Sequence, residues 1–205
     1  MSKHVITPYE GKLDSVLIFG PPGSGKGTQG KFLSSAGNHY HLSSGDLFRG
    51  LSPESPAGKL YHKYAYQGLL LPDEATIEIW HHFVTGLIET HRYFPKEQLL
   101  LLDGIPRTLH QAQILDKYLE VKKIILLNVE DKDVLIRRLK RRSLIEKRGD
   151  DSDEIVLKKR MEVFEQQTLA VLQHYPKELV STFNANLRPL EVLRDILIDL
   201  SDLLS

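Results

Sequence analysis

The sequence predicts an α/β fold, a five-stranded parallel β-sheet with helices on both faces. Short apolar runs alternate along the chain with longer segments whose apolar residues recur at helical spacing. The runs are continuously apolar, which is typical of strands that are buried on both faces. Strand–helix–strand repeats join parallel strands through right-handed crossovers, so we expect three layers around one sheet.

Each expected strand covers an apolar run, and the strongest runs end at a residue that begins a turn. The first strong run ends at Gly20, and a second ends at Asp103. Both boundaries place loop residues at the carboxyl ends of strands, where ligands bind in open parallel sheets. In chain order the expected strands are 16–19, 39–42, 99–102, 124–129 and 180–183, of which the second and the last are the weakest.

The expected helices carry apolar residues on one side. Asp73 follows Pro72 and begins a helix that runs through Ile88, with Trp80 and Val84 at helical spacing. A helix also follows the glycine-rich loop after the first strand. The other expected helices span 131–142, 153–175 and 189–204.

The composition excludes several classes of protein. The chain has 205 residues, no cysteine, and 27 basic against 27 acidic residues. It therefore cannot be a disulfide scaffold or bind zinc through thiolates. A neutral chain does not favour nucleic acid, which rewards a basic face. No apolar run approaches the ~18 residues of a membrane helix, and the N-terminus lacks the apolar region of a signal peptide. We expect no nucleic-acid or membrane partner and a cytoplasmic location.

The length fits one domain spanning residues 1–205. Residues 1–14 are expected to be an N-terminal extension that precedes the first strand. Residues 43–72 contain several glycines and prolines and no strong strand, so we expect an insert at the rim of the sheet.

A glycine-rich loop with a lysine follows the first strand and precedes a helix. Its sequence, residues 20–28, is Gly-Pro-Pro-Gly-Ser-Gly-Lys-Gly-Thr. Glycines let backbone N–H groups turn toward phosphate oxygens, and the helix N-terminus favours the same anion. The lysine adds a full charge for the β- and γ-phosphates. Gly27 stands where the general pattern has a hydroxyl that touches magnesium. The residues expected to bind phosphate are Gly23, Ser24, Gly25, Lys26, Gly27 and Thr28.

Asp103 ends a buried apolar run, which places its carboxylate at the edge of the sheet where ligands bind. An acid at this edge can hold hydrated magnesium beside phosphates. Asp103-Gly104 also fits an ordinary turn. Arg107 and Gln111 follow closely, and they favour a functional site over a turn alone.

Residues 137–148 contain seven basic side chains. A run of basic residues is most often the solvated face of a helix. A nucleic-acid-binding patch is disfavoured, because no aromatic residue lies among these basic residues. Phosphoryl transfer explains it better, because guanidinium groups match the charge that spreads over the moving phosphoryl oxygens. Arg137 and Arg141 lie off the Arg138–Arg142 stripe and are expected at the surface.

Together these motifs resemble the adenylate kinase family of nucleoside monophosphate kinases, from about Val16 to the C-terminal helix. The phosphate loop, the Asp-Gly-Ile-Pro-Arg-Thr motif at 103–108 and the segments 42–49, 68–74 and 138–142 carry the resemblance. It implies the three-layer P-loop NTPase fold with two mobile inserts, an NMP-binding insert at 43–72 and a short lid at 142–151. A short lid without cysteine implies no zinc.

The resemblance also assigns roles to residues. ATP would be bound by the phosphate loop, with Arg138 stacking on its base and Arg142 facing its phosphates. Asp103 would hold Mg²⁺ through water. The residues implied to act in catalysis are Lys26, Arg107, Arg142, Arg148 and Arg160. The residues implied to bind AMP are Ser44, Arg49, Leu69, Leu70, Leu71, Gly104, Ile105, Pro106, Arg107, Gln111, Arg148 and Arg160.

The implied activity is that of an adenylate kinase. The γ-phosphoryl of Mg-ATP would pass directly, in line, to AMP to give two ADP, reversibly, and we expect a monomer. One alternative is a UMP/CMP kinase of the same fold, although Thr108 and Gln111 resemble the adenylate form. Another is a non-catalytic nucleotide-binding regulator, which would not need Lys26, Asp103 and the arginines together.

Overall fold

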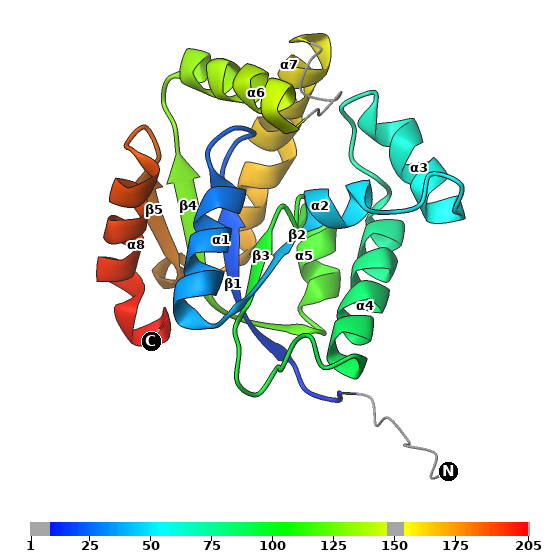
Figure 1. The fold of residues 1–205 in the computed structure, drawn as a ribbon, viewed down its shortest axis with the longest axis vertical. Helices are drawn as coiled ribbons and strands as arrows, with labels where there is room; N and C mark the ends of the chain where they lie inside the picture. The colour runs from blue at the N-terminus through cyan, green and yellow to red at the C-terminus, as the bar shows by residue number, and fades with distance from the viewer. Residues whose placement is uncertain (1–8, 147–153, 205) are drawn as a thin grey trace.

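The computed structural model describes residues 9–146 and 154–204 of the chain (Figure 1). The described part has one five-stranded sheet, in which every pairing is parallel and the strand order is β2-β3-β1-β4-β5. The predicted fold class is therefore confirmed. The strands are β1 (Leu13–Phe19), β2 (Tyr40–Ser43), β3 (Leu100–Asp103), β4 (Leu119–Asn128) and β5 (Val180–Asn184).

The central strand β1 pairs with β3 on one side and with β4 on the other. It begins at Leu13, inside the segment that was expected to be an N-terminal extension, because Leu13 pairs with Leu119 at the start of β4. Pairing also lengthens β4 well before the apolar run at 124–129. The register places Ile18 opposite Asp103, so the phosphate loop and this acid leave the sheet side by side.

Eight α-helices are described, and they surround the sheet and its carboxyl edge (Figure 1). They include all the helices expected from the sequence except the last part of the segment 153–175. The α-helices are α1 (Lys26–Gly37), α2 (Ser44–Arg49), α3 (Pro56–Ala65), α4 (Asp73–Glu89), α5 (Leu109–Leu115), α6 (Lys132–Glu146), α7 (Glu154–Val163) and α8 (Pro189–Leu204).

The segment expected to be one helix over 153–175 is helical from Glu154 to His174, but it is not an α-helix throughout. After α7 the chain widens into the π-helix η2 (Phe164–Thr168) and then tightens into the 3-10 helix η3 (Leu169–His174); the short 3-10 helix η4 (Lys177–Leu179) leads into β5. Within η2 the hydroxyl of Thr168 donates a hydrogen bond of 3.1 Å to the carbonyl of Arg107. The irregular turn thus connects this segment to the loop after β3, and such π-turns often occur at functional sites.

Two apolar cores lie on the two faces of the sheet, which confirms the three-layer arrangement. Alternate strand residues divide between them, so Leu17 belongs to one core and Val16 to the other. The first core is covered by α4, α5 and η3 and includes Trp80, which is 1% exposed. The second is covered by α1, α6, α7 and α8. Among the described helices, none combines the length and the apolar character needed to cross a membrane.

Candidate active site

The phosphate loop forms the turn between β1 and α1. Gly25 is the N-cap of α1 and has a φ of 99°, a conformation that residues with a side chain rarely adopt. Gly23, also at positive φ, lies against α6, because a Cβ there would come within 3.0 Å of the carbonyl oxygen of Leu135. The glycines therefore serve both the turn of the loop and its contact with α6.

Lys26 extends back along the loop from the first turn of α1. Its ammonium Nζ donates hydrogen bonds to the carbonyl oxygens of Gly20, at 2.8 Å, and Pro21, at 3.1 Å. Burial lowers the pKa of Lys26 to about 8; Asp103 opposes this shift, while Arg107 and two further arginines add to it. The lowered pKa therefore reflects first the burial of the ammonium and then the positive charges of nearby arginines.

Asp103 lies at the carboxyl end of β3, directly beside the phosphate loop. The residue is 7% exposed, and its Oδ2 lies 3.4 Å from where a Cβ on Gly27 would be. On the other side, Nε2 of the buried His41 is 3.9 Å from Oδ2. Among residues 9–146 and 154–204, no three potential metal-ligating side chains gather. One carboxylate next to a phosphate-binding loop fits Mg²⁺, which keeps several waters and takes ligands from substrate phosphates.

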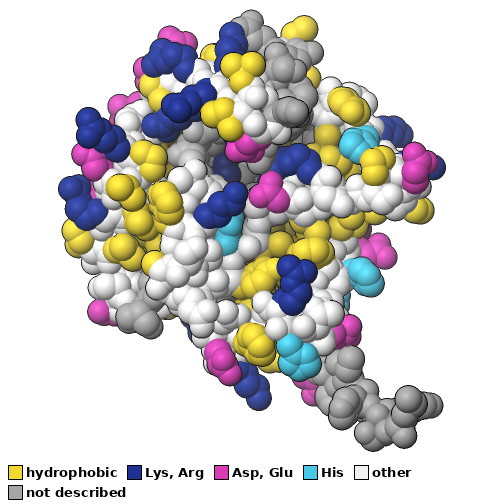
Figure 2. Space-filling model, in the orientation of Figure 1, with side chains coloured by type: hydrophobic (Ala, Val, Ile, Leu, Met, Phe, Trp, Pro, Cys, Tyr) yellow, Lys and Arg dark blue, Asp and Glu magenta, His cyan; other side chains and the backbone are white. Residues whose placement is uncertain are grey.

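A cavity of about 610 Å³ opens at this edge of the sheet. In Figure 2 the middle of the drawn face is hollowed, with charged side chains around the hollow. Most residues predicted for the site line this one cavity. They are Gly23, Ser24, Gly25, Lys26, Gly27, Thr28, Arg49, Leu69, Leu70, Leu71, Asp103, Gly104, Pro106, Arg107, Gln111, Arg138, Arg142 and Arg160.

Two predicted AMP-binding residues do not line the cavity. Ser44 is 1% exposed, and its hydroxyl donates a 2.7 Å hydrogen bond to the carbonyl of Gly104. Ile105 is 2% exposed and belongs to the core that α4 and α5 cover. Ser44 therefore holds the loop after β3 by a hydrogen bond, and Ile105 anchors the same loop in the core. A third predicted residue, Arg148, lies outside the described residues, as do the acids Asp150 and Asp151.

Arg107 is held by the backbone of its own loop. Its Nε donates a 2.7 Å hydrogen bond to the carbonyl of Gly104. Burial lowers its pKa to about 10; the like charge of Arg160 adds to the shift, and Asp103 opposes it. The guanidinium nevertheless stays charged at neutral pH and lines the cavity.

Gln111, on the first turn of α5, is buried and hydrogen-bonded at both ends of its amide. Its Oε1 accepts a 2.7 Å hydrogen bond from the backbone N–H of Arg107. Its Nε2 donates a 2.8 Å hydrogen bond to Oδ1 of Asp73, the first residue of α4. The other carboxylate oxygen of Asp73 accepts a 2.8 Å hydrogen bond from the hydroxyl of Thr108, which also caps α5.

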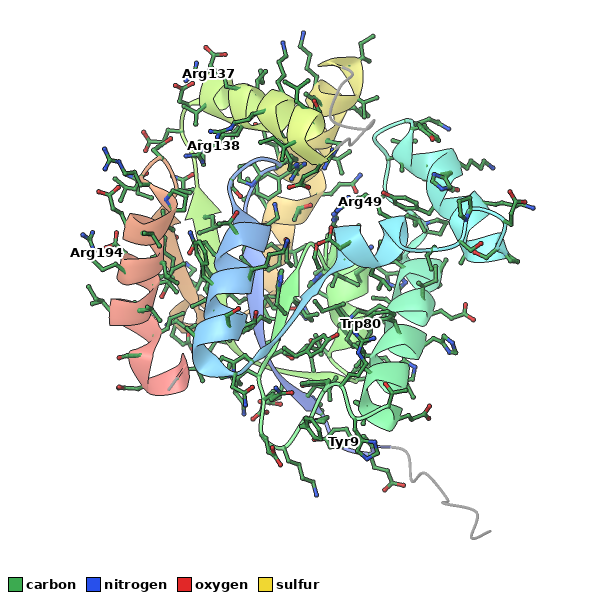
Figure 3. The ribbon with its side chains drawn as sticks, in the orientation of Figure 1. Tyr9, Arg49, Trp80, Arg137, Arg138 and Arg194 are labelled. Carbon is green, nitrogen blue, oxygen red and sulfur yellow. The ribbon has the colours of Figure 1, made fainter. Side chains whose placement is uncertain are left out.

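The arginines of α6 and α7 approach the cavity from the opposite side. In Figure 3, Arg138 on α6 and Arg49 on α2 lie on either side of the phosphate loop. Arg138 donates a 2.8 Å hydrogen bond to the carbonyl of Ala185, after β5. Arg137 is exposed, as expected. Arg141 is exposed as well, as expected, and it also lines the cavity.

Several residues of the cavity were not singled out from the sequence. Phe48 and Tyr61 line it and stack on each other at 5.9 Å, which joins α2 to α3. Thr168 lines it as well. No sequence pattern marks Tyr61 or Thr168, because their positions depend on how the insert and η2 fold. Phe48 could have been predicted to line the cavity, because it is next in sequence to the predicted AMP-binding residue Arg49.

The comparisons with known proteins agree with this geometry. The family model described as adenylate kinase matches residues 18–180. An adenylate kinase of Flavobacterium johnsoniae is 35% identical over 167 residues, covering 78% of this chain and 84% of that protein. Adenylate kinases of Chlamydia muridarum and Chlamydia trachomatis serovar L2 are each 34% identical, covering 89% and 91% of this chain and 85% and 89% of theirs. The chain therefore belongs to the adenylate kinase family.

Proposed function

We propose that the protein transfers the γ-phosphoryl group of ATP directly to the phosphate of AMP, giving two ADP, and that it also catalyses the reverse reaction. One observation carries the proposal. A single cavity is lined by the phosphate loop, by Asp103 and Arg107 after β3, and by arginines from α6 and α7. A site that only bound a nucleotide would not need cations on both sides of the phosphates.

The donor nucleotide would bind on the α1 side of the cavity. Backbone N–H groups of the loop and the N-terminus of α1 favour the phosphates of ATP. Lys26 would exchange its carbonyl partners for phosphate oxygens, which are the better partners for an ammonium. Arg138 would lie against the base, and Arg142 would face the phosphates.

The acceptor would bind on the α2–α3 side. Arg107 and Arg160 would hold the phosphate of AMP, joined by Arg49. Arg148, which lies outside the described residues, would join them by the family resemblance. Leu69, Leu70 and Leu71, which line the cavity, would pack against the base that Gln111 reads.

In the reaction, an oxygen of the AMP phosphate attacks the γ-phosphorus as the bond to the β–γ bridging oxygen breaks. Arginines and Lys26 neutralise charge on the moving group, and no covalent enzyme intermediate is required. A Mg²⁺ ion bound beside Asp103 would supply further charge neutralisation and orient the phosphates. We also propose that the insert at 43–72 and the lid at 142–151 close over the substrates and exclude water.

The test compares ADP formation from Mg-ATP with and without AMP, in the wild type and in Arg107→Ala. We expect two ADP for each AMP consumed, and little ADP without AMP. The Arg107→Ala variant should lose about 10²–10³ in kcat. The control is Arg194→Ala, since Arg194 on α8 is exposed and pairs with Asp195. ADP formation that does not depend on AMP, or unchanged turnover of Arg107→Ala, would contradict the proposal.

A further inference from the structure

The amide of Gln111 can adopt only one of its two orientations. One end meets the backbone N–H of Arg107, which can only donate, and the other meets the Asp73 carboxylate, which can only accept. Turning the amide by 180° would bring two donors together at Arg107 and two acceptors together at Asp73. The partners themselves therefore assign Oε1 to the Arg107 side and Nε2 to the Asp73 side.

Asp73 is itself held in place. Its second oxygen accepts the hydroxyl hydrogen of Thr108, and the same hydroxyl oxygen accepts a 3.1 Å hydrogen bond from the backbone N–H of Gln111. Asp73 and Thr108 are not among the residues that line the cavity, whereas Gln111 is. The side-chain contacts of Asp73 therefore lead to the cavity through the Gln111 amide.

The two contacts leave Gln111 one N–H and one oxygen lone pair for a ligand, in a fixed order. The Watson–Crick edge of adenine offers the complement, an acceptor at N1 and a donor at the 6-amino group. Hypoxanthine has the same shape but the reverse pattern, a donor at N1–H and an acceptor at O6. A fixed amide can match only one of these two edges, while an amide that turns can match either.

We propose that Asp73 is a positioning residue that fixes the Gln111 amide and thereby makes the acceptor site select a 6-aminopurine over a 6-oxopurine. This inference rests on the proposed function, in which Gln111 reads the acceptor base. Rejection of a wrong edge is strong when buried polar groups would be left unpaired, and Gln111 is 1% exposed. Asp73 therefore contributes to specificity without touching the substrate.

The experiment measures kcat/KM for AMP and for IMP, with Mg-ATP as donor, in the wild type, Asp73→Ala and Gln111→Ala. The matched control is Glu74→Ala. Glu74 is the next residue of α4 and also contacts α5, through a 3.1 Å hydrogen bond with His110 at the surface. It does not touch Gln111. Thermal melting of every variant measures loss of folding separately.

In Asp73→Ala we expect the ratio of kcat/KM for AMP to that for IMP to fall about tenfold or more, because one of the two contacts that fix the amide is lost. Glu74→Ala should keep the wild-type ratio. As a second approach, Thr108→Val should lower the ratio and Thr108→Ser should restore it, since serine keeps the hydroxyl that holds Asp73.

An Asp73→Ala variant that loses activity on AMP and IMP equally would overturn the inference, because a merely structural role lowers both values alike. An equal fall of the ratio in Glu74→Ala would overturn it too. The proposed site has a separate outcome. If Gln111→Ala keeps the wild-type ratio, Gln111 does not read the base; if that variant lowers the ratio while Asp73→Ala does not, only the role of Asp73 fails.

Discussion

Replacing Lys26 with methionine removes one positive charge from the phosphate loop and keeps an unbranched side chain. In the proposed mechanism the ammonium stabilises charge that develops on the transferred phosphoryl group. Losing one such preorganised donor costs about 3–4 kcal/mol of transition-state stabilisation, so we expect kcat to fall about 10²–10³-fold.

The same substitution should leave the folded structure intact. Burial lowers the pKa of Lys26 from 10.5 to about 8, which means that holding the charged ammonium in the folded protein at pH 7 costs at most about 3 kcal/mol. Methionine removes this cost, but it leaves the carbonyls of Gly20 and Pro21 without the ammonium donor, which offsets the gain. We therefore expect similar stability at pH 7.

The pH dependence of stability separates the cost of the buried ammonium from the loss of its hydrogen bonds to the two carbonyls. Between pH 8 and 10.5 the folded wild type releases the Lys26 proton while the unfolded chain keeps it, so the unfolded state binds more protons and wild-type stability rises with pH. Lys26→Met lacks this rise. Its free energy of unfolding should therefore fall relative to the wild type by up to about 3 kcal/mol across this range.

The assays are steady-state ADP formation and urea unfolding at pH 7, 8, 9 and 10. The control is Lys177→Met, because Lys177 is exposed in η4. Near-normal turnover of a folded Lys26→Met variant would refute the role of the ammonium. A stability difference that does not change with pH would refute the burial argument alone.

Three further substitutions test individual contacts and one open position in the fold. Gly30→Ala should lower the free energy of unfolding by about 1–3 kcal/mol, because the added Cβ would overlap the buried imidazole of His41; an unchanged melting temperature would contradict this contact. Gly86→Ala in α4 should instead raise stability by about 0.5–1 kcal/mol and the melting temperature by about 1–4 °C, since nothing lies within 4 Å of its Cβ position. Thr168→Val should cost about 1–3 kcal/mol in urea unfolding because the carbonyl of Arg107 loses the hydroxyl donor, and Thr168→Ser should not.

The inner strands of this protein, such as β1 and β3, could be predicted because both of their faces are covered. A strand buried on two sides must be apolar throughout, and such runs are visible without knowing what packs on them. The exact bounds were harder to predict. Leu13 belongs to β1 only because it pairs with Leu119, and no local signal in the sequence reveals that partner.

The helix that was expected to continue to residue 175 shows another limit. Periodicity predicts that a segment is helical, but not that it widens into a π-turn at Phe164–Thr168. That turn accompanies a hydrogen bond to Arg107, 61 residues earlier in the chain. Contacts between segments distant in the sequence determine where a helix widens, and a single sequence does not show these contacts.

Much of the candidate site could be predicted, because phosphate chemistry needs particular residue types at particular spacings. Lys26 comes after β1 and Asp103 ends the adjacent strand β3, and the parallel register brings them to one edge. The sequence marks Asp73 as the first residue of a helix and as part of the segment 68–74, but not as a partner of Gln111. Its contact with Gln111 joins two helices, so its importance becomes visible only in three dimensions.

The central claim is that this site transfers a phosphoryl group to an adenine nucleotide. The most direct measurement follows ADP formation from Mg-ATP with AMP, CMP, UMP or GMP offered separately at equal concentration. The account predicts strong preference for AMP. Preferred turnover of CMP or UMP would keep the fold and the mechanism but contradict the assignment of the acceptor base, and tight ATP binding without turnover of any acceptor would contradict catalysis itself.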